Sequence, residues 1–162
     1  MGLLKTRLPL LILPVIGICL GAYWLISQSL PEGGSTEELL KKINSSHRDT
    51  VLSGYYYLTE RRDPSGREKA VIDLSSDEDY IWLNAALYLG SLGDEVAVPY
   101  LIKALRHTAW RSDEQTLSYL RKITQTNAGS DYADWKAWWD NQNSGIELSW
   151  DTWLGHNPRL PN

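Results

Sequence analysis

Residues 79–105 carry the clearest pattern of apolar and polar positions in the chain, and it predicts two amphipathic helices joined by a tight turn. In the first half, apolar residues recur at the spacing of three and four that lines one helix face: Ile81, Ala85, Ala86, Leu89 and Leu92. Gly93 is a residue that adopts left-handed backbone angles after a helix end, and Asp94 offers a carboxylate to the free amides of the next helix. The predicted core face of that second helix contains Val98, Leu101, Ile102 and Leu105.

Further helices are predicted on both sides of this pair. Three helices are predicted before it, at residues 37–43, 47–62 and 67–74. The helical pattern is interrupted between the last two by Asp63-Pro64-Ser65-Gly66. A helix that starts at Ser112 or Asp113 and a helix from Asp131 follow it, separated by a loop at residues 125–130. Residues 144–162 are expected to form an irregular tail. The predicted core of residues 47–62 consists of Val51, Leu52, Tyr55, Tyr56 and Leu58.

The apolar positions also repeat along the chain. An offset of about 31 residues pairs Leu58 with Leu89 and Asp63 with Asp94, and an offset of about 34 pairs Leu101 with Trp135. The chain therefore divides into three predicted helix pairs at residues 47–76, 78–108 and 112–142. Units of this kind bury their apolar faces only against neighbouring units, so about three are needed for a stable array.

Residues 8–27 are a mostly apolar run without a charge, and they predict a transmembrane helix that acts as a signal anchor. About twenty residues at a rise of about 1.5 Å each span roughly 30 Å of hydrocarbon. Lys5 and Arg7 precede the run, so residues 1–7 are expected in the cytoplasm and the C-terminal domain on the exterior or periplasmic side. Ser27 and Ser29 form a small-x-small site, so secretion after cleavage is the alternative. Residues 28–36 are a polar linker to the domain at residues 37–143.

Residues 48–142 resemble HEAT repeats, most closely in the stretch AALYLGSLGDEVAVPYLIKAL at residues 85–105. Residues 117–142 are similar to the terminal segment of many bacterial HEAT-like proteins. The first unit departs from the pattern, because Arg61 and Arg62 replace the small and apolar residues expected before its turn. The resemblance implies an all-α fold, in which a short right-handed α-solenoid of about three helix pairs follows one transmembrane helix. The HEAT motif is a packing motif, so it transfers no catalytic residue.

Charge and composition limit the chemistry of this domain. The chain has a formal net charge of −4, and without Lys5 and Arg7 it keeps 14 basic and 20 acidic residues, a charge of −6. An acidic domain argues against nucleic-acid binding. The only cysteine, Cys19, lies in the apolar run, which leaves the domain without a disulfide, a cysteine metal site or a thiol nucleophile. The three histidines are scattered, so no catalytic, cofactor or metal site is predicted.

Two groups of side chains are candidates for binding a partner. The first is Trp150 and Trp153 in the tail, which either bind a partner or pack back on the domain. The second is the pair Arg61 and Arg62, which forms a positive patch with Arg67 and Lys69. This patch is either a solvated turn or a docking site for an acidic partner or lipid headgroups.

The three tryptophans of the last helix have a different interpretation. Trp135, Trp138 and Trp139 fall on core positions of the repeat, so they are predicted to seal the end of the array. A role as an aromatic platform for a ligand is the alternative.

Together these features predict a membrane-anchored HEAT-repeat module of a bacterial envelope that binds proteins as a scaffold, without catalytic activity. One alternative is a small structural subunit of an envelope complex assembled through its transmembrane helix. Another is a lyase-type enzyme accessory, because HEAT-like repeats also occur in bilin lyases. Those act in the cytoplasm, whereas the positive-inside rule places this domain outside.

Overall fold

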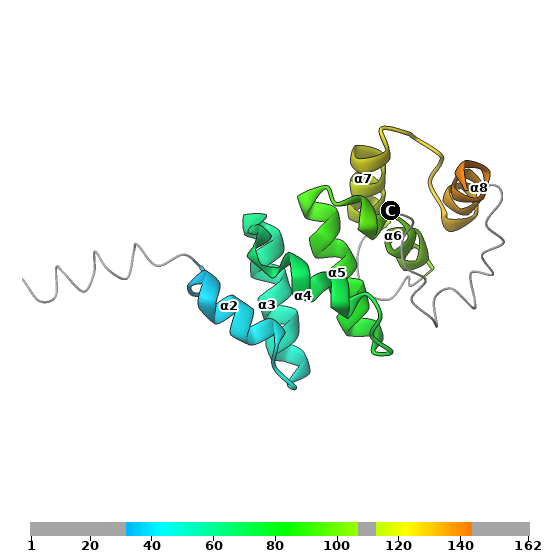
Figure 1. Cartoon of the computed structure of the whole chain (residues 1–162). Helices are drawn as coiled ribbons and strands as arrows, with labels where there is room; N and C mark the ends of the chain where they lie inside the picture. The colour runs from blue at the N-terminus through cyan, green and yellow to red at the C-terminus, as the bar shows by residue number, and fades with distance from the viewer. Residues whose placement is uncertain (1–31, 107–112, 144–162) are drawn as a thin grey trace, which may run out of the picture. The chain divides into compact units, whose positions relative to one another are not determined.

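A computed structural model describes residues 32–106 and 113–143, and all regular structure in these ranges is helical (Figure 1). The predicted all-α class is confirmed for these residues. The elements are α2 (Thr36–Ile43), α3 (Arg48–Arg61), the 3-10 turn η1 (Pro64–Gly66), α4 (Arg67–Asp73), α5 (Asp79–Leu92), the 3-10 turn η2 (Glu95–Ala97), α6 (Val98–Ala104), α7 (Asp113–Thr124) and α8 (Tyr132–Gln142).

The predicted transmembrane segment at residues 8–27 and the tail at residues 144–162 lie outside the described residues. Within the described ranges, every helix is too short or too polar to cross a membrane. The described residues from Thr36 onwards belong to one compact unit.

Two successive helix pairs have the same element lengths. Both α3 and α5 contain 14 residues, η1 and η2 contain three, and α4 and α6 contain seven. The elements begin at residues 48 and 79, 64 and 95, and 67 and 98, an offset of 31 each time. The helices α7 and α8 begin 34 residues after α5 and α6, at residues 113 and 132. The element starts therefore follow both offsets of the apolar pattern.

The helix α5 lies at the centre of the described fold, where it contacts α3, α4, α6 and α7. Between Trp82 and Ser91 every residue except Asn84 is buried. The prediction of a single apolar face was wrong for this helix, because neighbouring helices bury most of its circumference between these two residues. At Gly90 a Cβ atom would lie 3.0 Å from the Tyr119 ring and 3.1 Å from a Leu101 methyl group. A small residue there lets α6 and α7 approach the α5 backbone closely.

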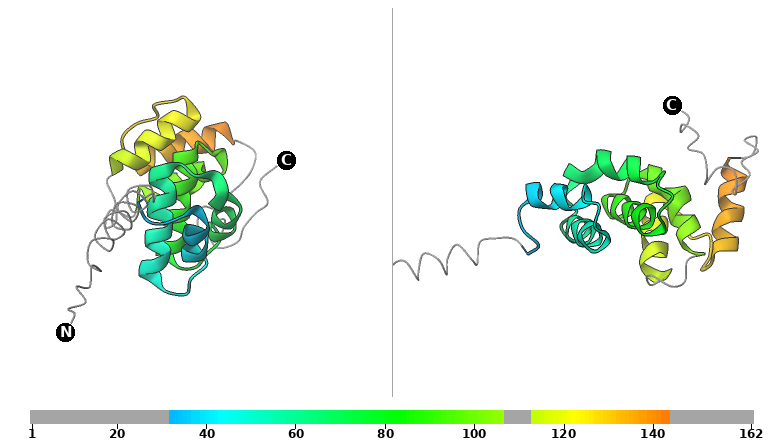
Figure 2. Two further views of the ribbon diagram at one scale, coloured as in Figure 1. Left: turned by 90° about the vertical axis from the view of Figure 1, so that its left-hand side faces the viewer. Right: turned by 90° about the horizontal axis from the view of Figure 1, so that it is seen from below.

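The described helices follow one another in chain order, as the view from below shows (Figure 2). At the N-terminal end, α2 packs on α3 through the buried side chains of Leu39 and Ile43. At the other end, α8 contacts α6. Each end of the described array is therefore covered by a helix that contributes its own apolar side chains.

The tryptophans of α8 divide into two kinds. Trp135 is fully buried and its indole nitrogen donates a hydrogen bond of 3.3 Å to the Gly129 carbonyl oxygen. Trp138 and Trp139 are partly buried and pack against the core from outside. The prediction of core positions was therefore correct for Trp135 and only partly correct for the other two rings.

Candidate functional site

Two turns with the same backbone path connect the helices of the first two pairs. In the first turn (residues 62–66), Arg62 ends α3 and the Asp63 carboxylate accepts a hydrogen bond of 3.0 Å from the Ser65 amide. In the second turn (residues 93–97), Gly93 ends α5 and the Asp94 carboxylate accepts a bond of 3.2 Å from the Val96 amide. Each aspartate thus caps the 3-10 turn that starts the second helix of its pair.

The residue that ends the first helix has left-handed backbone angles in both turns. Gly93 has a φ of 79° and Arg62 a φ of 48°. The following amides, those of Asp63 and Asp94, donate back to the carbonyl oxygens of Leu58 and Leu89 at 3.1 and 3.0 Å. A side chain in this conformation costs about 1–2 kcal/mol that glycine avoids. The first turn therefore carries conformational strain that the second turn does not.

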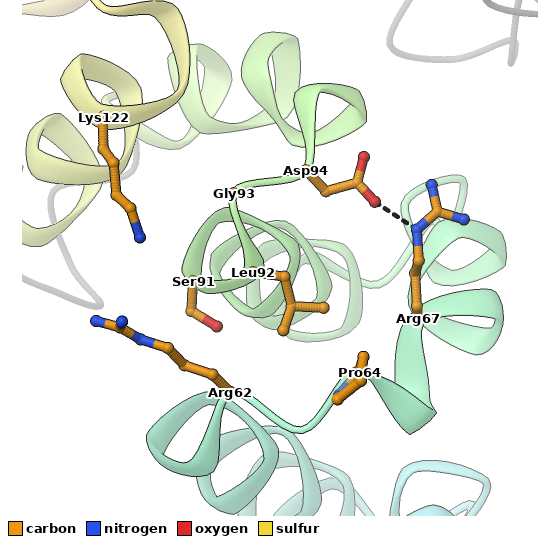
Figure 3. Close-up of a pocket in the computed structure, with 8 residues that line it drawn as sticks. All are labelled: Arg62, Pro64, Arg67, Ser91, Leu92, Gly93, Asp94 and Lys122. Carbon is orange, nitrogen blue, oxygen red and sulfur yellow. Dashed lines mark hydrogen bonds and ion pairs between the residues drawn. The ribbon is translucent and has the colours of Figure 1, made fainter.

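A groove of about 510 Å³ lies between the two turns, and we call it the turn groove (Figure 3). Its walls come from the ends of α5 and α7, from the start of α4 and from the turns that follow α3 and α5. The side chains and backbone atoms that line it belong to Arg62, Pro64, Arg67, Ser91, Leu92, Gly93, Asp94 and Lys122.

Charge is distributed unevenly over the turn groove. On one side, the Arg67 guanidinium and the Asp94 carboxylate form an ion pair with an N–O distance of 2.6 Å. On the other side, the side chains of Arg62 and Lys122 extend toward the same space (Figure 3). Both residues are exposed, and within residues 32–106 and 113–143 neither forms an ion pair. One end of the turn groove is thus positively charged and the other is internally neutralised.

Tyr88 of α5 fixes the first turn from below. Its hydroxyl accepts a hydrogen bond of 3.1 Å from the Gly66 amide and donates one to the Asp63 carbonyl oxygen. Burial raises the pKa of Tyr88 to about 12, so the hydroxyl stays protonated at neutral pH. The side chain of Asp63 also accepts a hydrogen bond of 2.5 Å from the Thr36 hydroxyl, which lowers the pKa of Asp63. The turn that contains the strained Arg62 is therefore held by hydrogen bonds from two other helices, α5 and α2.

The predicted positive patch is only partly present. Lys69 forms an ion pair with Asp73, a buried acid that also accepts a hydrogen bond of 2.5 Å from the Tyr55 hydroxyl. Burial raises the pKa of Tyr55, so this hydroxyl acts as a donor. Arg67 is paired with Asp94, and Arg61 is half-buried and outside the groove lining. Of the four predicted basic residues, Arg62 alone points an uncompensated charge into the turn groove.

A second, smaller groove of about 370 Å³ lies between α3 and α5. It is lined by Leu52, Ser53, Tyr56, Tyr57, Leu83, Asn84 and Leu87. Tyr56 is 43 % exposed, so its assignment to the core was wrong; its helix position faces outward beside α5. The rings of Tyr56 and Tyr57 pack edge to face with their centroids 5.1 Å apart, and together they form a small aromatic surface.

Lys122 was missed by the sequence analysis. It lies near the end of α7, in the third predicted unit, and no spacing rule relates it to Arg62. The residue patterns did identify the two turns that form the groove. The two predicted tail residues, Trp150 and Trp153, lie outside the described residues.

The described residues contain no group of three or more histidine, cysteine, aspartate or glutamate side chains placed to hold a metal ion. Comparisons of the chain with protein-family models, curated proteins and solved structures gave no match.

Proposed function

We propose that this protein is a membrane-anchored, non-catalytic interaction module whose helix pairs form a short right-handed HEAT-like α-solenoid. The observation that carries the proposal is the turn groove. It is open, about 510 Å³ in volume, and has two cationic side chains at one end. Arrays of repeated helix pairs use such surfaces, formed by neighbouring units, to bind proteins.

The solenoid interpretation is supported by the equal element lengths of the first two pairs and by the contacts of α5 with α3 and α7. These contacts pack the first helices of consecutive units against one another. A third pair at an offset of 34 continues the same order.

Residues 8–27 are proposed to anchor this module in the membrane with the helical domain on the exterior side. A tether of this kind raises the effective concentration of partners at the membrane. The proposed partner is a protein, and the alternative is a structural subunit that assembles through residues 8–27 themselves.

Affinity capture after chemical cross-linking, followed by mass spectrometry, tests this proposal. It compares the full-length protein with a full-length variant in which an unrelated transmembrane helix replaces residues 8–27. A partner captured by both proteins supports the interaction module. A partner lost on the exchange supports the alternative, and an absence of any specific partner overturns the proposal.

A further inference from the structure

We propose that the turn groove binds an acidic segment of the partner protein, with one carboxylate held between the Arg62 guanidinium and the Lys122 ammonium. This inference rests on the proposed interaction function and names the chemistry of the partner. Arg62 is the first residue after α3 and Lys122 belongs to α7, and both side chains lie on the same side of the groove (Figure 3). A guanidinium binds a carboxylate through two parallel hydrogen bonds, and a nearby ammonium adds a third donor.

The charge of the surrounding domain makes these two cations selective. The chain beyond residue 7 has 14 basic and 20 acidic residues, so its net charge of −6 disfavours non-specific binding of an acidic segment. Four other cations of the described helices, Lys41, Arg67, Lys69 and Lys136, form ion pairs with neighbouring acids. Complementary charge therefore favours docking of an acidic segment at the turn groove.

The groove favours a carboxylate over a phosphate. Phosphate sites draw on free backbone amides at helix starts and turns. Here the Ser65 and Val96 amides already donate to the aspartates of their own turns. Between the charged ends, Leu92 and Pro64 provide apolar carbon for a neighbouring aliphatic side chain.

The conformation of Arg62 is a second, independent observation. Arg62 has left-handed backbone angles at the position where the second turn has Gly93. Glycine at position 62 would form the same turn without strain. Strained backbone conformations are concentrated at binding sites, where the side chain has a use that offsets the cost. Here the strained residue is Arg62, whose side chain lies at the cationic end of the groove.

The test uses the full-length protein in detergent and a short fluorescent peptide that alternates leucine and glutamate, with a glutamine version of the peptide as control. Arg62→Gly removes the guanidinium and keeps the left-handed turn, and Lys122→Gln removes the ammonium. The matched control is Lys41→Gln, which removes one exposed charge from α2, away from the groove. We expect each groove variant to bind the glutamate peptide with a dissociation constant about tenfold higher or more, because charge-assisted hydrogen bonds are lost. We expect Lys41→Gln to bind like the parent protein.

Four results would overturn the inference. They are equal binding by the parent and both groove variants, equal binding of the two peptides, no binding by the parent, and tighter binding of a phosphoserine version of the peptide. Capture of a partner by Arg62→Gly as well as by the parent would reject the acidic segment and leave the proposed function intact. Peptide binding without any captured partner would reject the proposed function alone.

Discussion

The first turn (residues 62–66) and the second turn (residues 93–97) follow the same backbone path with different side chains. The second turn has Gly93 at its left-handed position. Its aspartate is held by one ion pair, from Arg67. The first turn has Arg62 at that position, and it is supported by the Tyr88 hydroxyl from α5 and the Thr36 hydroxyl from α2. The strained turn is thus the one with more tertiary support.

This difference shows which residues the chain reversal itself requires. A glycine and a capping aspartate are sufficient to reverse the chain between the two helices of a pair. An arginine at the glycine position adds nothing to that reversal and costs free energy. The proposed binding of an acidic segment gives this arginine a use, because its side chain lines the turn groove.

Removal of the Tyr88 hydroxyl should have the largest effect on this comparison. In Tyr88→Phe the Gly66 amide, which is buried, and the Asp63 carbonyl oxygen lose their hydrogen-bond partner. We expect the free energy of unfolding to fall by about 1–3 kcal/mol. Chemical denaturation of the full-length protein in detergent measures this loss. Tyr119 lies 31 residues after Tyr88 and bonds through its hydroxyl to Gln115 within α7, so Tyr119→Phe is the control. An equal loss in the two variants would contradict the special support of the first turn.

Exchange of the left-handed residues should have opposite effects in the two turns. Gly93→Ala places a Cβ atom at a φ of 79° and should destabilise the protein by about 1 kcal/mol. Arg62→Gly should stabilise it by a few tenths of a kcal/mol to about 1 kcal/mol, because relief of strain exceeds the added chain entropy of glycine. Thermal or chemical unfolding measures both changes. If Arg62→Gly lowered the free energy of unfolding instead, packing of the arginine side chain would stabilise the fold, and the strain argument would be wrong.

The protonation of Asp63 should have the smallest effect. The Thr36 hydroxyl is the main cause that lowers the folded-state pKa of Asp63 below the ordinary value of about 3.9. The ionised group therefore contributes stability above that value, and the contribution is lost as the pH falls through the folded-state pKa. Thr36→Val should raise the pKa of Asp63 toward the ordinary value. The free energy of unfolding should then depend less on pH in this range. NMR titration of the carboxyl group checks the change, and an unaltered pKa would contradict the assigned cause.

The local elements of this protein were predictable because their signals lie close together in sequence. Periodic apolar residues, Gly93, and the aspartates at positions 63 and 94 indicated the helices and both turns. The structure places α3 at residues 48–61 and α5 at residues 79–92, within one residue of the helix and turn positions expected from those signals. The repeat offset of 31 was also readable, because equal units repeat their capping residues as well as their apolar positions.

The cationic end of the turn groove was decided by tertiary structure. Lys122 lines the same groove as Arg62 only because α7 packs against α5 and α6, and contacts between distant segments leave no local spacing in the sequence. The same reason explains why most of α5 is buried and why Arg67 is paired with Asp94, 27 residues further along the chain. The sequence by itself determined which residues cap the helices, which form the turns and which occupy periodic apolar positions, since these effects act within about one helical turn. Packing determined which charges remain available to a partner, because that depends on which side chains the fold brings within a few ångströms of one another.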